Sequence, residues 1–399
     1  MVNCNLTNTK PETPSLPTVQ FVHPLKESKN EMTKIFALFL LMTAVLSFSA
    51  CHSQNQNQEG TGETRTVEDV WGRAVKIPVT VKSIICLGSG APRLAAYLNA
   101  VDMMVGNESH DASDRTVLRD YNIVHYETLK KLPLVGAGGG GGSNNGYPEA
   151  IIMAAPDVIL ATFSPDAADE LFSQTGIPVV CVRHASQNFV DETFYNAMRV
   201  FAEVIGAQER CEEVLSFIDD CKKDLNERTI DILDHQKLKS YIGAVNFKGR
   251  HGFAGTYANF GPLMGINAIN VADEFSAVGF FQADLEKVLL WDPDVIFLDP
   301  GNMDMVHSEY STNPNYFKSL RAIQEGRVYT MPSFNGNGTN ITYALMNAYY
   351  AGTVLFPEQF ADVDIAEKSA EILTFFLGKD TFPMMVDGGL YYGKITMGE

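Results

Sequence analysis

The chain of 399 residues is long enough for two or three domains. It is 45% hydrophobic and 20% charged, which supports a large buried core and excludes wholesale disorder. The formal net charge is −18 and no basic run offsets it, so we expect no binding to nucleic acid.

The first 65 residues concern targeting rather than folding. Residues 1–31 are polar and unpatterned, and we predict a non-structural leader there with Met32 as the true start. In residues 32–50, Lys34 precedes an apolar run that is shorter than the roughly 20 residues of a membrane span. This pattern predicts an export signal.

The signal ends in small residues before Cys51 and resembles the lipobox of bacterial lipoproteins, with Phe48 where leucine is usual. The resemblance implies cleavage before Cys51, acylation of that cysteine and anchoring to a membrane at the periplasmic or extracellular face. The alternative is a buried apolar helix behind a short tail. Residues 51–65 are rich in Gln, Asn, Gly and Glu, which predicts a flexible tether.

Four further cysteines lack CxxC spacing and stand in apolar strand-like or helical patterns, so we predict buried small side chains rather than a disulfide scaffold or a zinc site. They are Cys86, Cys181, Cys211 and Cys221.

Short β-branched runs alternate with helical stretches beyond residue 65. We predict buried parallel strands at 83–87, 103–106, 157–161 and 178–182, and helices at 92–99 and 148–154. This alternation is typical of an open α/β sheet. A helix leading into Pro156-Asp157-Val158-Ile159 is echoed by a helix leading into Pro293-Asp294-Val295-Ile296, which suggests two lobes of related build.

Between the two copies, apolar residues recur every seven positions from Ala197 to Leu225 without an intervening proline. We predict one long helix from Glu192 to about Arg228, with a possible bend at Gly206. The alternative is two shorter helices within one domain.

The ordered set of these segments resembles the helix-backboned periplasmic binding proteins of ABC importers for iron complexes, haem and cobalamin. The matching segments span roughly residues 66–378 and are Val70-Trp71-Gly72-Arg73 through Pro78, Lys82 through Gly88, Asp102 through Gly106, Leu134-Val135-Gly136, the two Pro-Asp-Val-Ile copies, Thr175 through Val180, Asp284-Leu285-Glu286 and Gly326-Arg327-Val328-Tyr329.

The resemblance implies an α/β fold with two Rossmann-like lobes, joined by a single long backbone helix, and a ligand cleft between them. The lobes are expected at 66–190 and 229–399, with the connecting helix at 191–228. The implied protein is no enzyme and carries no cofactor. It is a lipid-anchored binding component that captures a metal complex and delivers it to an ABC permease with its ATPase.

Other segments resemble the molybdate- and tungstate-binding subgroup of that family, namely Gly90 through Leu94, His251-Gly252, Tyr257 through Phe260 and Tyr343 through Pro357. A molybdate or tungstate oxyanion is therefore the alternative cargo. Typical iron-complex binders carry glutamate where this chain has Arg93, and that glutamate pairs with permease arginines. Arg93 suits an anion at a strand-to-helix turn, or it is a solvated surface charge.

In the first lobe we expect ligand contacts at loops that follow strands. The turn Gly88-Ser89-Gly90 offers backbone amides and the Ser89 hydroxyl, unless it is an ordinary tight turn. The glycine-rich stretch 136–147 lacks the lysine of a P-loop and has no helix start where a dinucleotide site needs one. We predict instead a loop at the mouth of the cleft, with Tyr147 as its anchor.

In the second lobe His251 follows the predicted strand 241–245, beside Arg250, and is a candidate oxyanion donor or iron ligand. The loop 333–342 offers amides, although Asn also favours turns. The ligand candidates here are His251, Tyr257, Asn335, Asn337 and Asn340. We leave the metal ligands unassigned, because Met303, Met305 and His307 more simply belong to a variable loop.

Two rivals remain. A secreted α/β enzyme lacks any supporting motif, since HExxH, GxSxG and a complete P-loop are all absent. A surface receptor without its own permease is motivated by Arg93 in place of the usual glutamate.

Overall fold

The computed structural model describes residues 62–139, 144–183, 190–275 and 279–398, which belong to one compact unit, Gly62–Glu399. The predicted leader, the signal, Cys51 and most of the tether lie outside the described residues. Strand β1 (Thr64–Glu68) begins within the predicted tether and pairs antiparallel with β2 (Ala74–Pro78). No helix in the described part of the chain is long and apolar enough to cross a membrane.

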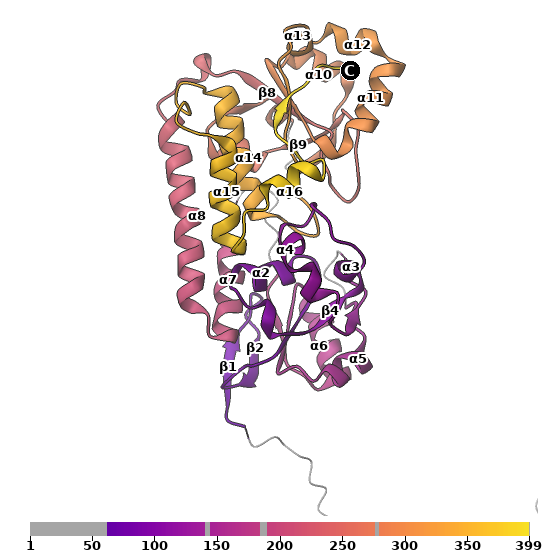
Figure 1. The fold of residues 1–399 in the computed structure, drawn as a ribbon, viewed down its shortest axis with the longest axis vertical. Helices are drawn as coiled ribbons and strands as arrows, with labels where there is room; N and C mark the ends of the chain where they lie inside the picture. Colours follow the sequence, from indigo (N-terminus) through magenta and orange to yellow (C-terminus); the bar gives the residue numbers. More distant parts are fainter. Residues whose placement is uncertain (1–61, 140–143, 184–189, 276–278, 399) are drawn as a thin grey trace, which may run out of the picture. The chain divides into compact units, whose positions relative to one another are not determined.

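Lobe 1, described over 62–139 and 144–183, is built on a parallel sheet of five strands in the order β5-β4-β3-β6-β7. Figure 1 draws this lobe in indigo to magenta, with β4 labelled. The four predicted strands are all present, with ends shifted by one or two residues. The strands are β3 (Ile84–Leu87), β4 (Met104–Glu108), β5 (Leu134–Gly136), β6 (Val158–Ala161) and β7 (Val179–Cys181). The helices are α2 (Ala91–Tyr97), η1 (Val101–Met103), α3 (Ser109–Ala112), α4 (Asp120–Leu129), α5 (Pro148–Ala154) and α6 (Pro165–Thr175).

Lobe 2, described over 230–275 and 279–398, has a sheet in the order β10-β8-β12-β13-β14, parallel except for β14. A separate antiparallel pair is formed by β9 and β11. The strands are β8 (Lys239–Gly243), β9 (Gly255–Ala258), β10 (Ile269–Asn270), β11 (Gly279–Gln282), β12 (Val295–Leu298), β13 (Val328–Thr330) and β14 (Gly393–Lys394). The helices are η2 (Asp234–Gln236), α9 (Gly261–Gly265), η3 (Val271–Glu274), α10 (Leu285–Trp291), η4 (Pro300–Asn302), α11 (Met303–Thr312), α12 (Pro314–Ser319), α13 (Arg321–Gln324), α14 (Ile341–Leu355), α15 (Ile365–Leu377) and α16 (Phe382–Asp387).

The echoed sequence has a structural reason in both lobes. Helices α5 and α10 end at a left-handed residue, Ala155 with φ 48° and Asp292 with φ 43°, and the following proline prevents either helix from continuing. The aspartate of each Pro-Asp-Val-Ile copy then holds the start of the neighbouring strand, because Asp157 Oδ2 accepts from Ser83 N at 2.9 Å and Asp294 Oδ2 accepts from Lys239 N at 2.8 Å. The repeat thus places β6 beside β3 and β12 beside β8.

The predicted single helix from Glu192 to Arg228 is wrong in its first half. Two helices occupy this stretch, α7 (Glu192–Ile205) and α8 (Gln208–Thr229), because Gly206 adopts φ 78° and caps α7. The helices fold back on each other, with Tyr195 hydrogen-bonded to Asp219 and Arg199 to Glu212. The seven-residue pattern did not reveal the break, because both helices bury their stripe in the same core. Helix α8 is the longer of the two and leads into lobe 2.

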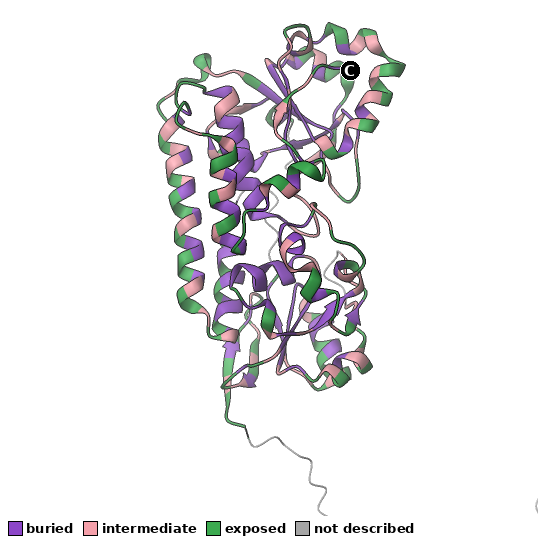
Figure 2. Ribbon diagram, viewed as in Figure 1, coloured by how far each residue is buried: buried purple, intermediate pink, exposed green. Residues whose placement is uncertain are grey.

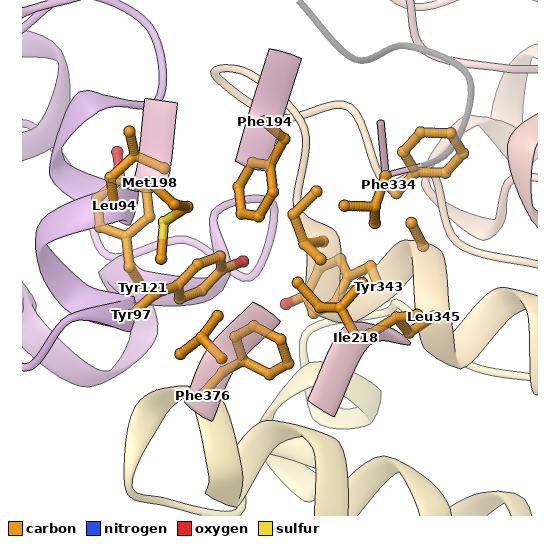
Figure 3. Close-up of a cluster of buried hydrophobic side chains, with 14 of the residues drawn as sticks. Leu94, Tyr97, Tyr121, Phe194, Met198, Ile218, Phe334, Tyr343, Leu345 and Phe376 are labelled. Atoms are coloured by element: carbon orange, nitrogen blue, oxygen red, sulfur yellow. The ribbon is translucent and has the colours of Figure 1, made fainter. Parts of the chain in front are cut away.

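A second helix accompanies α8. Phe217 of α8 stacks on Phe375 of α15 at 4.0 Å between ring centroids, and α15 in turn reaches lobe 1, where Phe376 meets Tyr97 at 4.8 Å. Figure 3 shows residues of both lobes gathered around these helices in one hydrophobic cluster. Helix α14 is buried on nearly every side (Figure 2). The four predicted buried cysteines are free and buried, as expected.

Candidate functional site

The candidate residues lie where parallel strands end. In lobe 1 the chain order changes direction beside β3, which lies between β4 and β6, and in lobe 2 it changes beside β8, which lies between β10 and β12. Ligands of open α/β sheets bind outside the carboxyl ends of the strands at such points. The loops after β3, β4, β5, β8, β12 and β13 are therefore the elements that can form a site.

The turn after β3 is fixed by two glycines. Gly88 and Gly90 have φ of 84° and 85°, and a Cβ on Gly88 would lie 2.5 Å from Thr162 Oγ1. Side chains are therefore excluded on either side of the half-buried Ser89. Gly90 lies directly before α2, so the turn leads into the first amides of that helix. A ligand-binding role for Ser89 stays a prediction.

Arg93 in α2 is fully buried, so the interpretation of Arg93 as a solvated surface charge is wrong. Its Nε donates to Asp120 Oδ1 at 2.8 Å, Nη1 donates to Asn337 O at 3.0 Å, and Nη2 donates to Gly336 O at 2.8 Å. Its ring partner is Tyr121, at 5.1 Å from the guanidinium carbon. The side chain links lobe 1 to the loop after β13 in lobe 2, and a ligand-binding role for it stays a prediction.

Asn337 and Asn340 meet Arg93 in this interlobe network. Asn340 Oδ1 accepts from Arg93 Nη2 at 2.7 Å and from Asp120 N at 3.1 Å, while its Nδ2 donates to Leu118 O at 3.0 Å. Thr342 Oγ1 donates to Asp120 Oδ2 at 2.8 Å. The amide of Asn340 is thus committed to protein partners. Asn337 is half-buried with φ 51°, and its Nδ2 donates to the Tyr121 hydroxyl at 3.4 Å. Asn335 is half-buried and bridges Thr339 through the backbone.

Tyr147 lies at the start of α5 and is 43% exposed. Its backbone N donates to Val135 O at 2.8 Å, and this hydrogen bond ties the end of the glycine-rich stretch back to β5. Part of the predicted mouth loop, residues 140–143, lies outside the described residues. Helix α5 begins at Pro148, after the glycine-rich stretch, whereas a dinucleotide site needs a helix that starts within it.

His251 belongs to an aromatic patch (Phe247, His251 and Phe280) beyond the carboxyl end of β8. Phe247 and Phe280 stack at 5.0 Å between ring centroids, and the His251 ring lies 4.3 Å from Phe280. His251 Nε2 lies 2.9 Å from Phe247 O and its Nδ1 lies 3.0 Å from Gln282 Nε2. A neutral ring that donates from Nε2 and accepts at Nδ1 satisfies both contacts. Both nitrogens of this candidate ligand are therefore occupied by protein groups.

Tyr257 lies behind this patch rather than on it. The residue is 1% exposed, and its ring meets Phe247 and Phe260, each at 6.3 Å between centroids. Burial raises the pKa of the Tyr257 hydroxyl to about 12, so it stays neutral. Arg250 is turned away from the patch, with Nε donating to Asn302 Oδ1 at 2.8 Å.

Sequence reasoning missed two buried acids at the strand ends, Glu108, which is the last residue of β4, and Asp299, which directly follows β12. They are 1% and 3% exposed. Burial raises the pKa of Glu108 to about 8 and that of Asp299 to about 7, because a desolvated carboxylate is unfavourable. Both acids stand at the end of a strand, but in the sequence that position carries no sign of burial.

Asp299 is held by Asn246 Nδ2, which donates to its Oδ2 at 3.0 Å, and by Gly301 N at 2.9 Å. Among the described residues, no group of three or more His, Cys, Asp or Glu side chains is arranged to hold a metal ion. Met303, Met305 and His307 lie in α11, a helix rather than the variable loop that we expected.

Comparison with known proteins supports the same fold. The model of a periplasmic binding protein family matches residues 84–334. The molybdate-binding protein MolA of Haemophilus influenzae is 24% identical over 320 residues, which cover 75% of this chain and 87% of the relative.

Solved structures are similar over most of the chain. A periplasmic solute-binding protein from Veillonella parvula has a TM-score of 0.62 at 16% identity, covering 82% of this chain and 97% of its own. MolA bound to molybdate has a TM-score of 0.60 at 20% identity, covering 79% and 98%. The iron-uptake system-binding protein FeuA from Bacillus subtilis has a TM-score of 0.51 at 20% identity, covering 71% and 98%.

Proposed function

Because this chain belongs to the periplasmic binding protein family, whose members bind solutes for ABC transporters, we propose that it captures a metal complex and delivers it to a membrane permease. Family membership implies a periplasmic location. The proposed cargo is an iron chelate or haem. The observation that carries this choice is the aromatic patch of Phe247, His251 and Phe280 at the carboxyl edge of lobe 2.

Stacked rings suit such a cargo because siderophores and haem present broad apolar or aromatic faces. Phe247 and Phe280 are only partly buried, so part of the patch remains accessible. Aromatic stacking contributes about 0.5–1.5 kcal/mol beyond the area that it buries. The similarity to the iron-uptake protein FeuA agrees with this cargo at the level of the fold.

A second candidate cargo is molybdate or tungstate, which the similarity to MolA favours. A tetrahedral oxyanion needs a small site that is dense in hydrogen-bond donors. The turn at Gly88-Ser89-Gly90 offers a hydroxyl and backbone amides for such a site. Glu108, whose Oε1 accepts from Gly88 N, opposes an anion at this turn whenever it is ionised.

We also propose that capture involves no covalent chemistry, so that the chain acts as a binding component and not as an enzyme. A protein that encloses a ligand between two lobes must release it as well as bind it. We expect release to occur when the protein docks on the permease. The receptor without its own permease differs only in lacking that partner. Neighbouring reading frames that encode a permease and an ATPase would exclude it.

Lipid anchoring through Cys51 completes the proposal and rests on the lipobox-like segment. The expected precursor begins at Met32 and loses its signal before Cys51. Mass spectrometry of the membrane fraction tests this directly: the mature N-terminus carries a diacylglyceryl group on Cys51, and a Cys51→Ala variant is recovered without lipid.

Strand β11 supplies a matched pair of variants for the cargo. Phe280 stacks in the patch, whereas the next residue, Phe281, points to the opposite side and stacks on Phe275 at 4.3 Å. In calorimetric titrations with ferrichrome, haemin and sodium molybdate, we expect Phe280→Ala to weaken an iron cargo about tenfold and Phe281→Ala to leave it unchanged. Binding of molybdate alone, with no effect of Phe280→Ala, would select the second cargo.

A further inference from the structure

Glu108 has a carboxyl oxygen without a hydrogen-bond partner, at the carboxyl end of β4 in lobe 1. Its Oε1 accepts from Gly88 N at 2.9 Å, so one oxygen is tied to the turn after β3. Its Oε2 is buried and has no hydrogen-bond partner among the described residues. A buried polar atom without a partner costs about 1–3 kcal/mol, and such an atom in a native protein commonly marks a missing water or ligand.

Glu108 is the acid of its surroundings that is expected to be protonated, because its charge is not compensated by a cation among the described residues. The nearest acid, Asp111 of α3, is compensated by Arg119 Nη1 at 3.0 Å and by the Tyr121 hydroxyl at 2.8 Å. His110 lies on the same short helix as Asp111. Cys86 of β3 is a buried neutral thiol, because burial and the two nearby acids raise its pKa. Among the described residues, Glu108 accepts a hydrogen bond from one backbone amide and forms no ion pair. Burial, with Asp111 adding, raises its pKa to about 8.

Gly138 lies close to the free oxygen. Gly138 has φ 78°, and a Cβ added there would lie 3.3 Å from Glu108 Oε2 and 2.7 Å from His110 Cβ. A side chain at this position would fill the space over the carboxyl group. In the described part of the turn after β5, a glycine without a side chain therefore lies beside Oε2.

We propose that Glu108 is a ligand-binding residue of lobe 1, and that its protonated Oε2 donates a hydrogen bond to a metal-bound oxygen of the cargo. This inference rests on the proposed function and adds a named donor and its protonation state. The shared chemistry is an acceptor oxygen bonded to a metal, which both an oxyanion and a hydroxamate chelate provide. Access requires the backbone at Gly136 and Gly138 to shift, and glycine permits that.

Binding then depends on pH with a defined sign. The neutral acid donates, whereas the carboxylate cannot donate and repels an electron-rich oxygen. With a pKa of about 8, Glu108 is mostly neutral at pH 7 and about nine-tenths ionised at pH 9, so affinity falls about tenfold between these values. An amide at this position also donates but does not titrate.

The experiment is calorimetric titration of the full chain with sodium molybdate and with ferrichrome at pH 7 and pH 9. Four proteins are compared: wild type, Glu108→Gln, Glu108→Ala and, as a control that makes the same substitution at an exposed glutamate, Glu212→Gln, whose side chain is 66% exposed. Circular dichroism confirms that each variant is folded. We expect wild type and Glu212→Gln to lose about tenfold in affinity at pH 9. Glu108→Gln binds up to about fivefold more weakly at pH 7 without that loss, and Glu108→Ala binds more weakly still.

Three results overturn the donor role: a Glu108→Gln variant with the pH profile of wild type, as expected if Oε2 meets only water; wild-type affinity that is flat or rises with pH; or a folded Glu108→Gln variant that binds neither probe. Failure of ferrichrome, haemin and sodium molybdate alike to bind wild type at either pH would instead overturn the proposed function, and this contact with it.

Discussion

Arg93 offers the sharpest test of how the lobes are joined, through the change Arg93→Ala. The guanidinium and Asp120 form an ion pair in which both side chains have 0% exposure. Removal of Arg93 leaves Asp120 buried with only hydroxyl and amide donors, among them Tyr97 and Thr342. Loss of one partner of a buried ion pair costs about 3–5 kcal/mol. We expect the free energy of unfolding to fall by that amount.

Urea denaturation followed by circular dichroism measures this loss, with Arg199→Ala as the matched control. Arg199 pairs with Glu212 at 3.5 Å, but the two side chains are 51% and 66% exposed, so that pair contributes no more than about 1 kcal/mol. Arg93→Lys keeps the charge but loses the fork of donors, and we expect an intermediate effect. A loss for Arg93→Ala as small as that for Arg199→Ala would refute the interlobe network as a source of stability.

Three further predictions concern single positions. Gly206→Ala lowers the free energy of unfolding by about 1 kcal/mol, because φ is 78° there; stabilisation, as expected in an unbroken helix, would contradict the break. Gly138→Ala destabilises the chain more than Gly139→Ala. Both have positive φ, but among the described residues a Cβ would meet close atoms at Gly138 and none within 4 Å at Gly139, and thermal unfolding compares the two variants. Glu108 and Asp299 bind protons in the folded chain that the unfolded chain has lost, so the free energy of unfolding falls between about pH 5 and pH 8, by up to ~1.4 kcal/mol per pH unit for each acid. Denaturation across this range is expected to show a smaller fall for Glu108→Gln, and an unchanged slope would exclude the proton on Glu108.

The strands were predictable because each is a short, β-branched run whose side chains are all buried, as in β3 and β12. The two Pro-Asp-Val-Ile copies were predictable for a related reason, since proline and aspartate act locally, at a helix end and a strand start. These features depend on neighbours in sequence or on one adjacent strand.

The role of Arg93 could not be predicted in this way, because its acceptors at Gly336 and Asn337 are 243 and 244 residues away. Local spacing only indicated an arginine near a turn. The break at Gly206 was hidden because the buried stripe continues through both helices. Glu108 was missed because an acid at a strand end carries no local sign of burial, which here depends on the turn after β5.

Direct binding tests the central claim that this chain captures a metal-containing cargo without changing it. Calorimetry with ferrichrome, haemin and sodium molybdate, followed by recovery of the bound compound and its mass spectrum, is the measurement. The account predicts one compound bound per chain, reversibly, and recovered intact. Binding of none of them, or recovery of a chemically altered compound, would contradict it.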